Sequence, residues 1–342
     1  MPHSSTAILL LAHGTPNALG EMAEYLAKVT GGRALPPEVI AELQHRYSQI
    51  GLKDEPGPEP PPLTKWTIAQ GRALEAALAK TGNPLPVYVA MRNWHPFIAD
   101  VVAQMRADGV TRVLAICLAP QNSRTSIGLY RRALMAVAEG LDVTFVDSWS
   151  EEPALIEAFA QRLAATYPRA CAEVAANTAE NHREQNGAEQ DAALPVVFTA
   201  HSVPERTLAA TPDMPADPYA DEATRTAALV FEKAAALLAA QSQSAPQQYL
   251  FAFQSQGVAG GPWIGPTVED TLTALAAEGH RGVVLQPIGF LCDHVEILYD
   301  IDIAFTQTAR TLNLRLFRPE SLNDSPLLVG ALVSVVEQRL VP

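Results

Sequence analysis

The sequence predicts an α/β protein of two similar doubly wound domains, each with a four-stranded parallel sheet, and a cleft between them. Three observations support this fold class. Short apolar runs alternate with longer amphipathic stretches, and the runs fall four and four along the chain. Each group also opens with a run that ends in Ala-His-x-x-Pro, as LLAHGTP and VFTAHSVP. Continuous apolar runs between helices are typical of buried parallel strands, and the repeated phrase suggests an old duplication.

The bulk composition limits the classes of partner and compartment. The 342 residues suffice for two domains, and 48% hydrophobic content supplies a sizeable core. A net charge of −13 argues against nucleic acid or an anionic membrane surface as partner. The apolar run at 7–12 is too short for a signal peptide or a membrane span, so we expect no integral membrane association. Three scattered cysteines, Cys117, Cys171 and Cys292, suit a reducing cytoplasm, and we expect a cytoplasmic monomer.

The apolar runs are the predicted strands, and they divide at a break near 149–153. The first four are AILLLA (7–12), VYVAM (87–91), RVLAICLA (112–119) and DVTFVDS (142–148). The second four are PVVFTA (195–200), QYLFAF (248–253), GVVLQP (282–287) and LRLFRP (314–319). We therefore expect an N-terminal domain at 1–150 and a C-terminal domain at 151–342.

The stretches between the strands predict helices and two irregular segments. Helices are expected at 68–78, 97–105 and 223–238, and a terminal helix at 326–340 is expected to pack back on the N-terminal domain. The proline-rich GLKDEPGPEPPPLT (51–64) predicts a surface loop. The polar stretch 177–193 predicts a loop before the fifth strand, and its role is left open.

The two histidines of the repeated phrase, His13 and His201, each directly follow a strand. Ligands of open parallel sheets bind beyond the carboxyl ends of the strands, so both side chains are expected to line the cleft. Because its unperturbed pKa is about 6.5, a histidine there can act as a base or a metal ligand. A capping residue in a tight turn explains the local pattern at His201 equally well.

The stretch GFLCDHVEILYDID (289–302) carries three carboxylates, Asp293, Glu296 and Asp300. On one helix their i, i+3, i+7 spacing places them on one face. A helix N-cap at Asp293 with Glu296 in the capping-box position is an alternative, although it leaves Asp300 unexplained. A line of carboxylates beside a histidine can bind a dication or pass protons, and open His/carboxylate sets suit ferrous iron.

Two tryptophan motifs are open to two interpretations. In MRNWHPF (91–97), Arg92 can pair with a carboxylate and Trp94 can flank a flat ligand. An ordinary strand–helix junction with the aromatic side chain in the core is the simpler interpretation. The same choice applies to Trp263 in GPWIGP.

These motifs together resemble the ferrochelatases. His-Ser-x-Pro after a strand, SQGVAGGPWIGP and GFLCDHVEILYDID carry the resemblance. LLAHGTP, RYSQIG (46–51), MRNWHPF and LAP (118–120) extend it in order over residues 7 to 340. The resemblance implies the type II chelatase fold, with two Rossmann-like domains around a porphyrin cleft. It also implies insertion of ferrous iron, as substrate, into a porphyrin in haem biosynthesis, with no organic cofactor.

The resemblance also implies roles for individual residues. His201 matches the family's active-site histidine, the proton acceptor, and Glu296 matches its glutamate, the partner in metal binding. Asp293 and Asp300 would form an acidic path for protons or metal. His13 stands where relatives that use coproporphyrin III often have a tyrosine that contacts the metal. The remaining candidates for porphyrin binding are Arg46, Tyr47, Met91, Arg92, Tyr130, Trp263 and Phe290. Some relatives hold an iron–sulfur cluster on four cysteines, and three scattered cysteines cannot supply that set.

The segment 30–64 is expected to form the lip over the cleft, and its composition bears on the substrate. It is short and carries Arg33, Arg46, Tyr47 and Lys53 among prolines and acids. Coproporphyrin III has four propionates against two on protoporphyrin IX, and carboxylates require arginine and hydroxyl partners. We therefore expect coproporphyrin III as preferred substrate. Thr30 replaces an arginine of some relatives, and Arg33 is a candidate substitute. The alternatives are a protoporphyrin IX ferrochelatase, a cobalt or nickel chelatase for a related tetrapyrrole, and a non-catalytic tetrapyrrole carrier.

Overall fold

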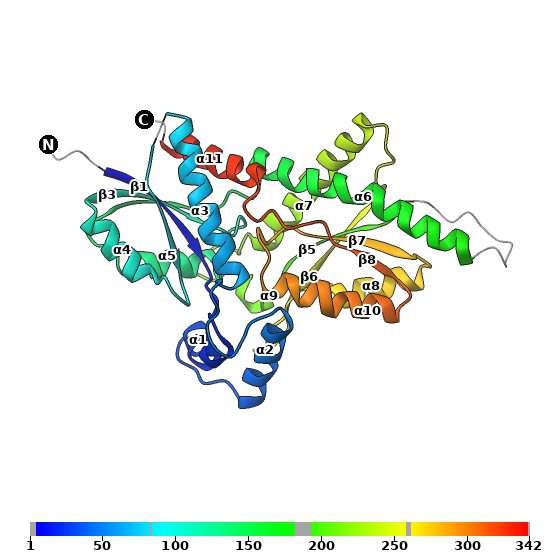
Figure 1. Ribbon diagram of the computed structural model, residues 1–342, viewed down its shortest axis with the longest axis horizontal. Coiled ribbons are helices and arrows are strands. Elements are labelled where there is room, and N and C mark those ends of the chain that lie inside the picture. Colours follow the sequence, from blue (N-terminus) through cyan, green and yellow to red (C-terminus); the bar gives the residue numbers. More distant parts are fainter. Residues whose placement is uncertain (1–4, 83, 182–192, 258–260, 341–342) are drawn as a thin grey trace. The chain divides into compact units, whose positions relative to one another are not determined.

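The computed structural model describes residues 5–82, 84–181, 193–257 and 261–340, and its strands in these residues form two parallel four-stranded sheets (Figure 1). The first sheet has the order β2-β1-β3-β4 and holds β1 (Ser5–Ala12), β2 (Val87–Met91), β3 (Val110–Cys117) and β4 (Asp142–Val146). The second has the order β6-β5-β7-β8 and holds β5 (Val196–His201), β6 (Tyr249–Gln254), β7 (Gly282–Pro287) and β8 (Arg315–Phe317). Both orders follow one scheme, which confirms the predicted α/β class with two similar parallel sheets.

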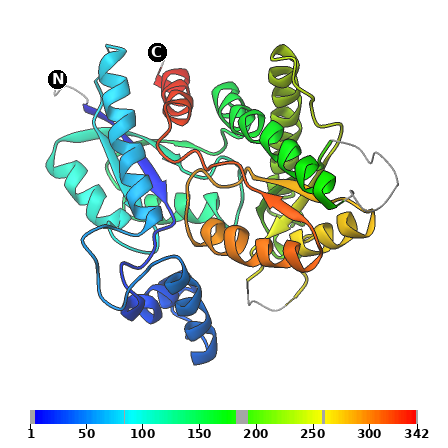
Figure 2. The same cartoon turned by 45° about the vertical axis from the view of Figure 1, so that its right-hand side comes forward.

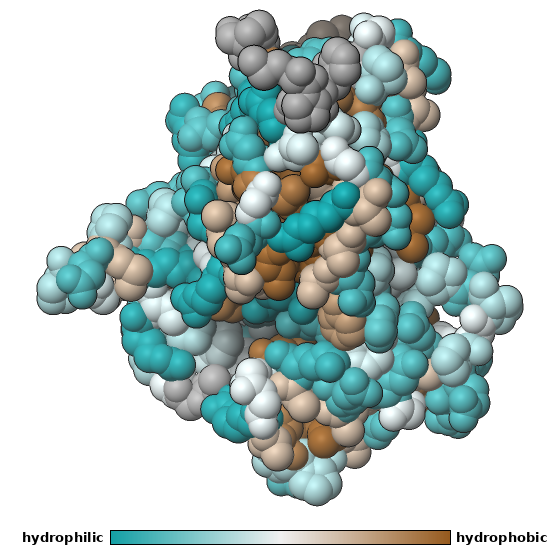
Figure 3. Space-filling view, turned by 90° about the vertical axis from the view of Figure 1, so that its left-hand side faces the viewer, coloured by the Kyte–Doolittle hydropathy of each residue, from teal (hydrophilic) through white to brown (hydrophobic). Residues whose placement is uncertain are grey.

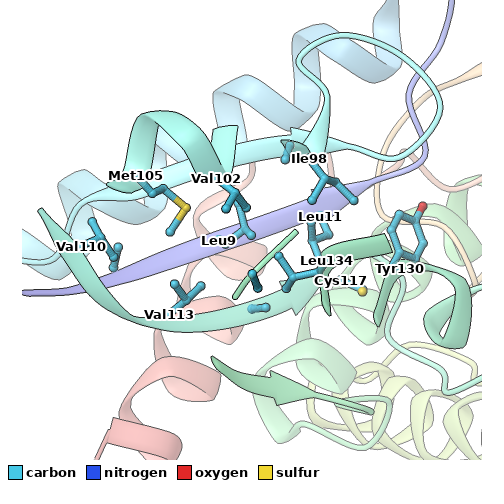
Figure 4. Close-up of a cluster of buried hydrophobic side chains, with 14 of the residues drawn as sticks. Leu9, Leu11, Ile98, Val102, Met105, Val110, Val113, Cys117, Tyr130 and Leu134 are labelled. Atoms are coloured by element: carbon cyan, nitrogen blue, oxygen red, sulfur yellow. The ribbon is translucent and has the colours of Figure 1, made fainter. Parts of the chain in front are cut away.

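Helices cover both faces of the first sheet, as the unbroken apolar strands require. Leu9 and Leu11 of β1 belong to a buried cluster with α4 (Ile98–Ala107) and α5 (Ile127–Met135), which Figure 4 shows in close-up. The intervening Leu10 faces α3 (Pro62–Lys80), where a Cβ built on Gly71 would lie 4.0 Å from the Leu10 side chain. All three leucines are completely buried.

A smaller helical layer precedes α3 in the same part of the chain. It consists of a 3₁₀ turn (Leu19–Glu21), α1 (Met22–Val29) and α2 (Pro37–Gln49). Its own apolar cluster is formed by Met22, Tyr25, Leu26, Tyr47 and Trp94. The predicted lip therefore contains a helix of 13 residues, and its proline-rich end passes into α3, which begins at Pro62.

The second sheet is also covered on both faces (Figure 2). The long α6 (Pro153–Asn181) and α7 (Tyr219–Ala240) pack against each other and contact β7 and β6, respectively. On the other side, α8 (Val268–Ala277) contacts β6, and α10 (Thr306–Thr311) contacts β8. A short 3₁₀ turn (Glu205–Thr207) follows β5, and a π-helix (Asp300–Phe305) precedes α10.

The chain divides into two compact units, and neither is one continuous segment. The first unit combines the chain up to Glu152 with Leu291–Tyr299 and the segment from Asn323. The second combines Pro153–Phe290 with Asp300–Leu322. Consequently α9 (Val295–Leu298) and α11 (Pro326–Leu340) belong to the first unit, and α11 contacts α3. Both helices come from the half of the chain that the sequence suggested as the C-terminal domain.

The structure matches the prediction for the terminal helix and differs from it at the predicted loop 177–193. The terminal helix runs from Pro326 to Leu340, as predicted. The prediction of a loop at 177–193 is wrong at its start, because α6 continues to Asn181. This stretch includes Ala179 and Glu180, residue types that favour helix. Residues 182–192 of that predicted loop lie outside the described residues.

One face of the molecule is mainly polar (Figure 3). Figure 3 shows the face at the left of Figure 1, where hydrophilic side chains cover most of the area and hydrophobic ones show between them. In the described chain, the large hydrophobic side chains that are more than a third exposed are Met135, Met214, Leu250 and Ile303. No helix among the described residues is long and apolar enough to cross a bilayer.

Candidate functional site

The two histidines occupy equivalent places in the two sheets. His13 directly follows β1, and His201 is the last residue of β5. β1 and β5 each have a strand on either side. The chain leaves β1 toward one edge of its sheet and β3 toward the other, and it does the same from β5 and β7 in the second sheet. This is the switch point of a doubly wound sheet, where ligands bind beyond the carboxyl ends of the strands.

His13 is held through both ring nitrogens. Its Nε2 lies 3.0 Å from the side-chain nitrogen of Asn93, and its Nδ1 lies 3.1 Å from the Tyr25 hydroxyl and 3.2 Å from the Gly14 carbonyl. An amide nitrogen can only donate, so Nε2 accepts and Nδ1 carries the proton. Tyr25 also donates its hydroxyl to the Gly14 carbonyl at 3.2 Å.

The turn after His13 requires a glycine. Gly14 has φ of +89°, a region that residues with a side chain rarely adopt. A Cβ at this position would lie 2.8 Å from the backbone nitrogen of Trp94. The close approach brings the turn after β1 against the segment that follows β2, which is where Asn93 lies.

Two buried aromatic side chains, Tyr25 and Trp94, pack beside His13. Tyr25 is buried between His13 and Trp94, with ring centroids 6.2 Å and 6.0 Å away in edge-on arrangements. Burial raises the pKa of the Tyr25 phenol well above its usual value, and the neighbouring Tyr47 raises it further. The phenol therefore stays neutral and remains a donor. Trp94 is only 3% exposed, which confirms the interpretation of this tryptophan as a core residue.

The candidates Arg46 and Tyr47 face different environments on α2. Tyr47 is buried in the cluster described above. The Arg46 side chain is 37% exposed, bonds to Glu42 at 3.0 Å, and has its guanidinium carbon 5.4 Å from the centre of the Tyr299 ring. Arg46 thus presents a positive charge next to the segment that carries α9.

Three further candidates are Met91 at the end of β2, Arg92 directly after it, and Tyr130 in α5. Met91 is fully buried, with its sulfur 3.9 Å from the Thr64 hydroxyl. Arg92 lies over the Tyr130 ring, 5.4 Å from its centre. Burial raises the pKa of the Tyr130 phenol, which is 4% exposed, so the ring acts as a neutral support for the guanidinium.

The acidic motif does not form the single helix that its spacing suggests. α9 begins only at Val295, and its N-cap is His294, so the predicted N-cap at Asp293 is wrong. The Asp293 carboxylate instead accepts a hydrogen bond of 3.0 Å from the side-chain amide of Asn323. After α9 the chain widens into the π-helix at Asp300, so the three carboxylates do not follow one regular α-helical face.

Glu296 lies in the first turn of α9 and is partly exposed. Its carboxylate is 3.5 Å from Nε2 of His294, while Nδ1 of His294 lies 3.1 Å from the Cys292 carbonyl. Glu296 is also close enough to raise the pKa values of Tyr25 and Tyr130 slightly through its negative charge, after the larger effect of their burial. In the first unit Glu296 is therefore near two buried phenols, that of Tyr25 beside His13 and that of Tyr130 beside Arg92.

His201 is oriented by its own backbone turn. Nδ1 donates to the carbonyl of Ser202, so the neutral ring has its lone pair on Nε2. The Tyr219 hydroxyl donates to the His201 carbonyl at 2.8 Å, and Ser202 donates to the Ile264 carbonyl at 2.8 Å. The ring centres of Trp263 and Phe290 lie 6.5 Å from that of His201.

Asp300 opens the π-helix of the second unit and is 7% exposed. Its carboxylate accepts a hydrogen bond from the hydroxyl of Ser255. Ser255 follows β6 with φ of +61°. π-Helical turns and left-handed non-glycine residues both cluster at functional sites. Asp300 and Ser255 are therefore candidate functional residues at the carboxyl edge of the second sheet.

Sequence reasoning missed four residues that hold the candidates in place, namely Tyr25, Asn93, Ser255 and Asn323. The signal for Asn93 was available, because it lies inside MRNWHPF. Among the described residues, no group of three or more His, Cys, Asp or Glu is arranged as a ready-made metal site.

Comparisons with known proteins agree over nearly the whole chain. A family model described as Ferrochelatase matches residues 5–340. A ferrochelatase of Acidobacterium capsulatum is 52% identical over 344 residues, covering 98% of this chain and 94% of the relative. A coproporphyrin III ferrochelatase of Geobacillus thermodenitrificans is 32% identical, covering 99% and 98%. The sirohydrochlorin chelatase SirB of Bacillus subtilis subspecies spizizenii has a similar fold, with a TM-score of 0.51 at 11% identity over 98% and 94% of the two chains.

Proposed function

The chain belongs to the ferrochelatase family, and we propose that the porphyrin it prefers is coproporphyrin III. As a ferrochelatase it is a lyase-type metal chelatase of haem biosynthesis, and its substrates are a porphyrin and ferrous iron. The reaction exchanges two N–H protons of the porphyrin for one Fe²⁺. A base must accept the protons, and the stiff ring must bend so that its nitrogens face the metal.

We propose His201 as the base. Its Nδ1 proton is engaged by the Ser202 carbonyl, so the lone pair that accepts a pyrrole proton is on Nε2. Glu296 is the proposed partner in metal binding, because its carboxylate is partly exposed at the start of a short helix. Asp300, held by Ser255, is the proposed group that passes protons onward.

The aromatic side chains near His201 suit the bending of the ring. Trp263 and Phe290 approach the imidazole at the same centroid distance, 6.5 Å, and at different tilts. A flat ligand against two such walls is pressed out of its plane, which in enzyme sites costs about 1–5 kcal/mol. Binding energy from the propionates would offset this strain.

The composition of the segment 30–64 carries the proposal for coproporphyrin III. None of the four large hydrophobic side chains that are more than a third exposed in the described residues lies in this segment. Arg33 and Lys53 are exposed, and Arg46 is half-buried with its charge over Tyr299. These side chains suit a ligand with four carboxylates better than a membrane-delivered one with two, and each charged hydrogen bond is worth roughly 1.5–3 kcal/mol.

The test is a comparison of kcat/KM for coproporphyrin III and protoporphyrin IX with ferrous iron, under anaerobic conditions and constant detergent. We expect the coproporphyrin value to be higher, and Arg46→Ala to lower it more than the protoporphyrin value. A tenfold or larger preference for protoporphyrin IX would overturn the substrate proposal. Cobalt and nickel salts serve as a further arm that examines metal preference.

We also propose that the protein is a cytoplasmic monomer without an iron–sulfur cluster. The cysteines support the absence of a cluster, because Cys117 and Cys292 are buried and belong to different segments of the first unit. Gel filtration of the purified protein tests the oligomeric state, its iron and sulfide content tests for a cluster, and cell fractionation tests the compartment.

A further inference from the structure

Asn323 makes four hydrogen bonds that join three segments of the first unit. Its side-chain oxygen accepts from the Asp293 amide at 2.9 Å, and its side-chain nitrogen donates to the Asp293 carboxylate at 3.0 Å. Its backbone amide donates to the Leu291 carbonyl at 2.8 Å. Its own carbonyl accepts from the side chain of Gln70, a fully buried residue of α3, at 2.7 Å.

The position suits asparagine for two reasons. Its φ is +48°, in the left-handed region that asparagine tolerates better than most residues with a side chain. Its amide also offers an acceptor and a donor at once, and Asp293 uses both. Aspartate would lack the donor, and glycine would lack the side chain.

The bonded segment leads directly into α9. Residues Leu291 to His294 precede the helix, and α9 has only four residues, Val295–Leu298. So short a helix has little stability of its own, and its placement depends on contacts from elsewhere. Asn323 bonds to Leu291 and Asp293 on one side and to Gln70 of α3 on the other. It therefore attaches the segment before α9 to α3, the helix that packs against one face of the first sheet.

We propose that Asn323 is a positioning residue for Glu296, and that Asp293 acts as its anchor rather than as a proton carrier. This inference rests on the proposed role of Glu296. The bonded chain runs from α3 through Gln70 and Asn323 to Leu291 and Asp293, and three residues later to Glu296. Groups that orient a metal-binding side chain typically change activity or metal affinity by about 10–100-fold when they are removed.

An exchange of the two partners tests the pair. Asn323→Asp sets two carboxylates against each other, and we expect kcat to fall by about 10–100-fold. Asp293→Asn alone should be mild, because an amide oxygen still accepts from Asn323. The double variant Asp293→Asn/Asn323→Asp restores one donor and one acceptor, and we expect it to recover most of the lost kcat. Binding of the porphyrin, followed by fluorescence quenching, should stay near the wild-type value throughout.

Asn313→Asp is the matched control, because Asn313 has a similar φ of +56° and lies in the second unit after α10. It should keep wild-type kcat. Wild-type kcat in Asn323→Asp, or a double variant as inactive as that single variant, would overturn the positioning role. Loss of activity in Asp293→Asn as large as in Asn323→Asp would overturn the anchor role and favour proton transfer.

Hydrogen–deuterium exchange separates this inference from the proposed function. The amides of residues 291–298 should exchange faster in Asn323→Asp and return toward the wild-type rate in the double variant. Unchanged exchange in Asn323→Asp would refute the positioning role of Asn323 even if activity fell. A wild-type protein that inserts no iron into either porphyrin would refute the proposed function. The exchange data would still show whether Asn323 positions residues 291–298.

Discussion

The side-chain amide of Asn93 lies 3.0 Å from Nε2 of His13, and the Asn93 backbone amide donates to the His13 carbonyl, also at 3.0 Å. The residue thus fixes both the backbone and the ring of His13. Since the amide donates, the lone pair of Nε2 is engaged, and any metal that His13 contacts through Nε2 must displace Asn93. His201 has the same Nδ1 contact with the carbonyl of its following residue, yet its ring is bordered by Trp263 and Phe290.

The first prediction follows from this competition. His13→Ala should alter the absorption spectrum of the bound iron porphyrin while some insertion activity remains. Asn93→Ala should also shift that spectrum, because it releases Nε2 for the iron. In the double variant Asn93→Ala should add nothing to the spectral change caused by His13→Ala, since Asn93 acts through His13. Identical product spectra in wild type and His13→Ala would assign the histidine to a structural role.

His201→Ala should remove most metal insertion while the fold and porphyrin binding are kept. The second unit retains the Tyr219 bond, because that bond uses the His201 backbone carbonyl and not the ring. Stopped-flow absorbance with ferrous iron measures the loss, and near-normal turnover would contradict the base assignment. His280→Ala is the control, because this histidine pairs with the surface carboxylate of Glu278 at 3.7 Å.

Glu296→Gln keeps the size of the side chain and removes its charge. We expect kcat to fall by orders of magnitude, because the negative charge that would bind ferrous iron is lost. Asp300→Asn should have a milder effect, because its amide oxygen still accepts from Ser255. Glu278→Gln, at a side chain that is 64% exposed, should leave the rate unchanged. An active Glu296→Gln enzyme would move the metal partnership to another carboxylate.

Gly14→Ala should destabilise the first unit more than a matched substitution at Gly31. Both glycines have positive φ, which costs an alanine about 1–2 kcal/mol. At Gly14 the Cβ also meets the Trp94 backbone, which adds ~1–3 kcal/mol of overpacking. At Gly31 it meets open space among the described residues. Urea unfolding of the two variants measures the difference, and equal midpoints would refute the close approach.

Thiol reactivity should separate the three cysteines. Burial raises the pKa of Cys292 to about 12, and burial also raises the pKa of Cys117. Both thiols therefore stay protonated near pH 8 in the folded protein and react slowly, because the thiolate is the nucleophile. In denaturant all three should react quickly. We expect one fast thiol, Cys171, in native titration with a chromogenic disulfide, and three fast native thiols would contradict the burial.

The sheets could be predicted from sequence because their strands are buried on both faces. Runs such as residues 7–12 are apolar at every position, and β1 is indeed covered by α3 on one side and by α4 and α5 on the other. The terminal helix was predicted at its observed bounds for a similar local reason, since Pro326 opens it.

The supports of the site could not be predicted, because they join residues that are far apart in sequence. Asn93 meets His13 across 80 positions, and Asn323 meets Asp293 across 30. The i, i+3, i+7 spacing of the acidic motif also predicted a helix that includes Asp293, whereas Asp293 lies before the helix. Periodicity assumes a regular helix, whereas the bonds from Asn323 hold the chain out of helix until Val295.

The division of the first unit among three stretches of chain has a consequence for its synthesis. Its sheet strands leave the ribosome before α11, which contacts α3. The second unit ends at Leu322, so its sequence is complete while α11 has still to be synthesised. A nascent chain therefore holds an unfinished first unit with the apolar side of α3 uncovered until α11 arrives. A premature stop before Asn323 would remove that cover and the anchor for α9 at once.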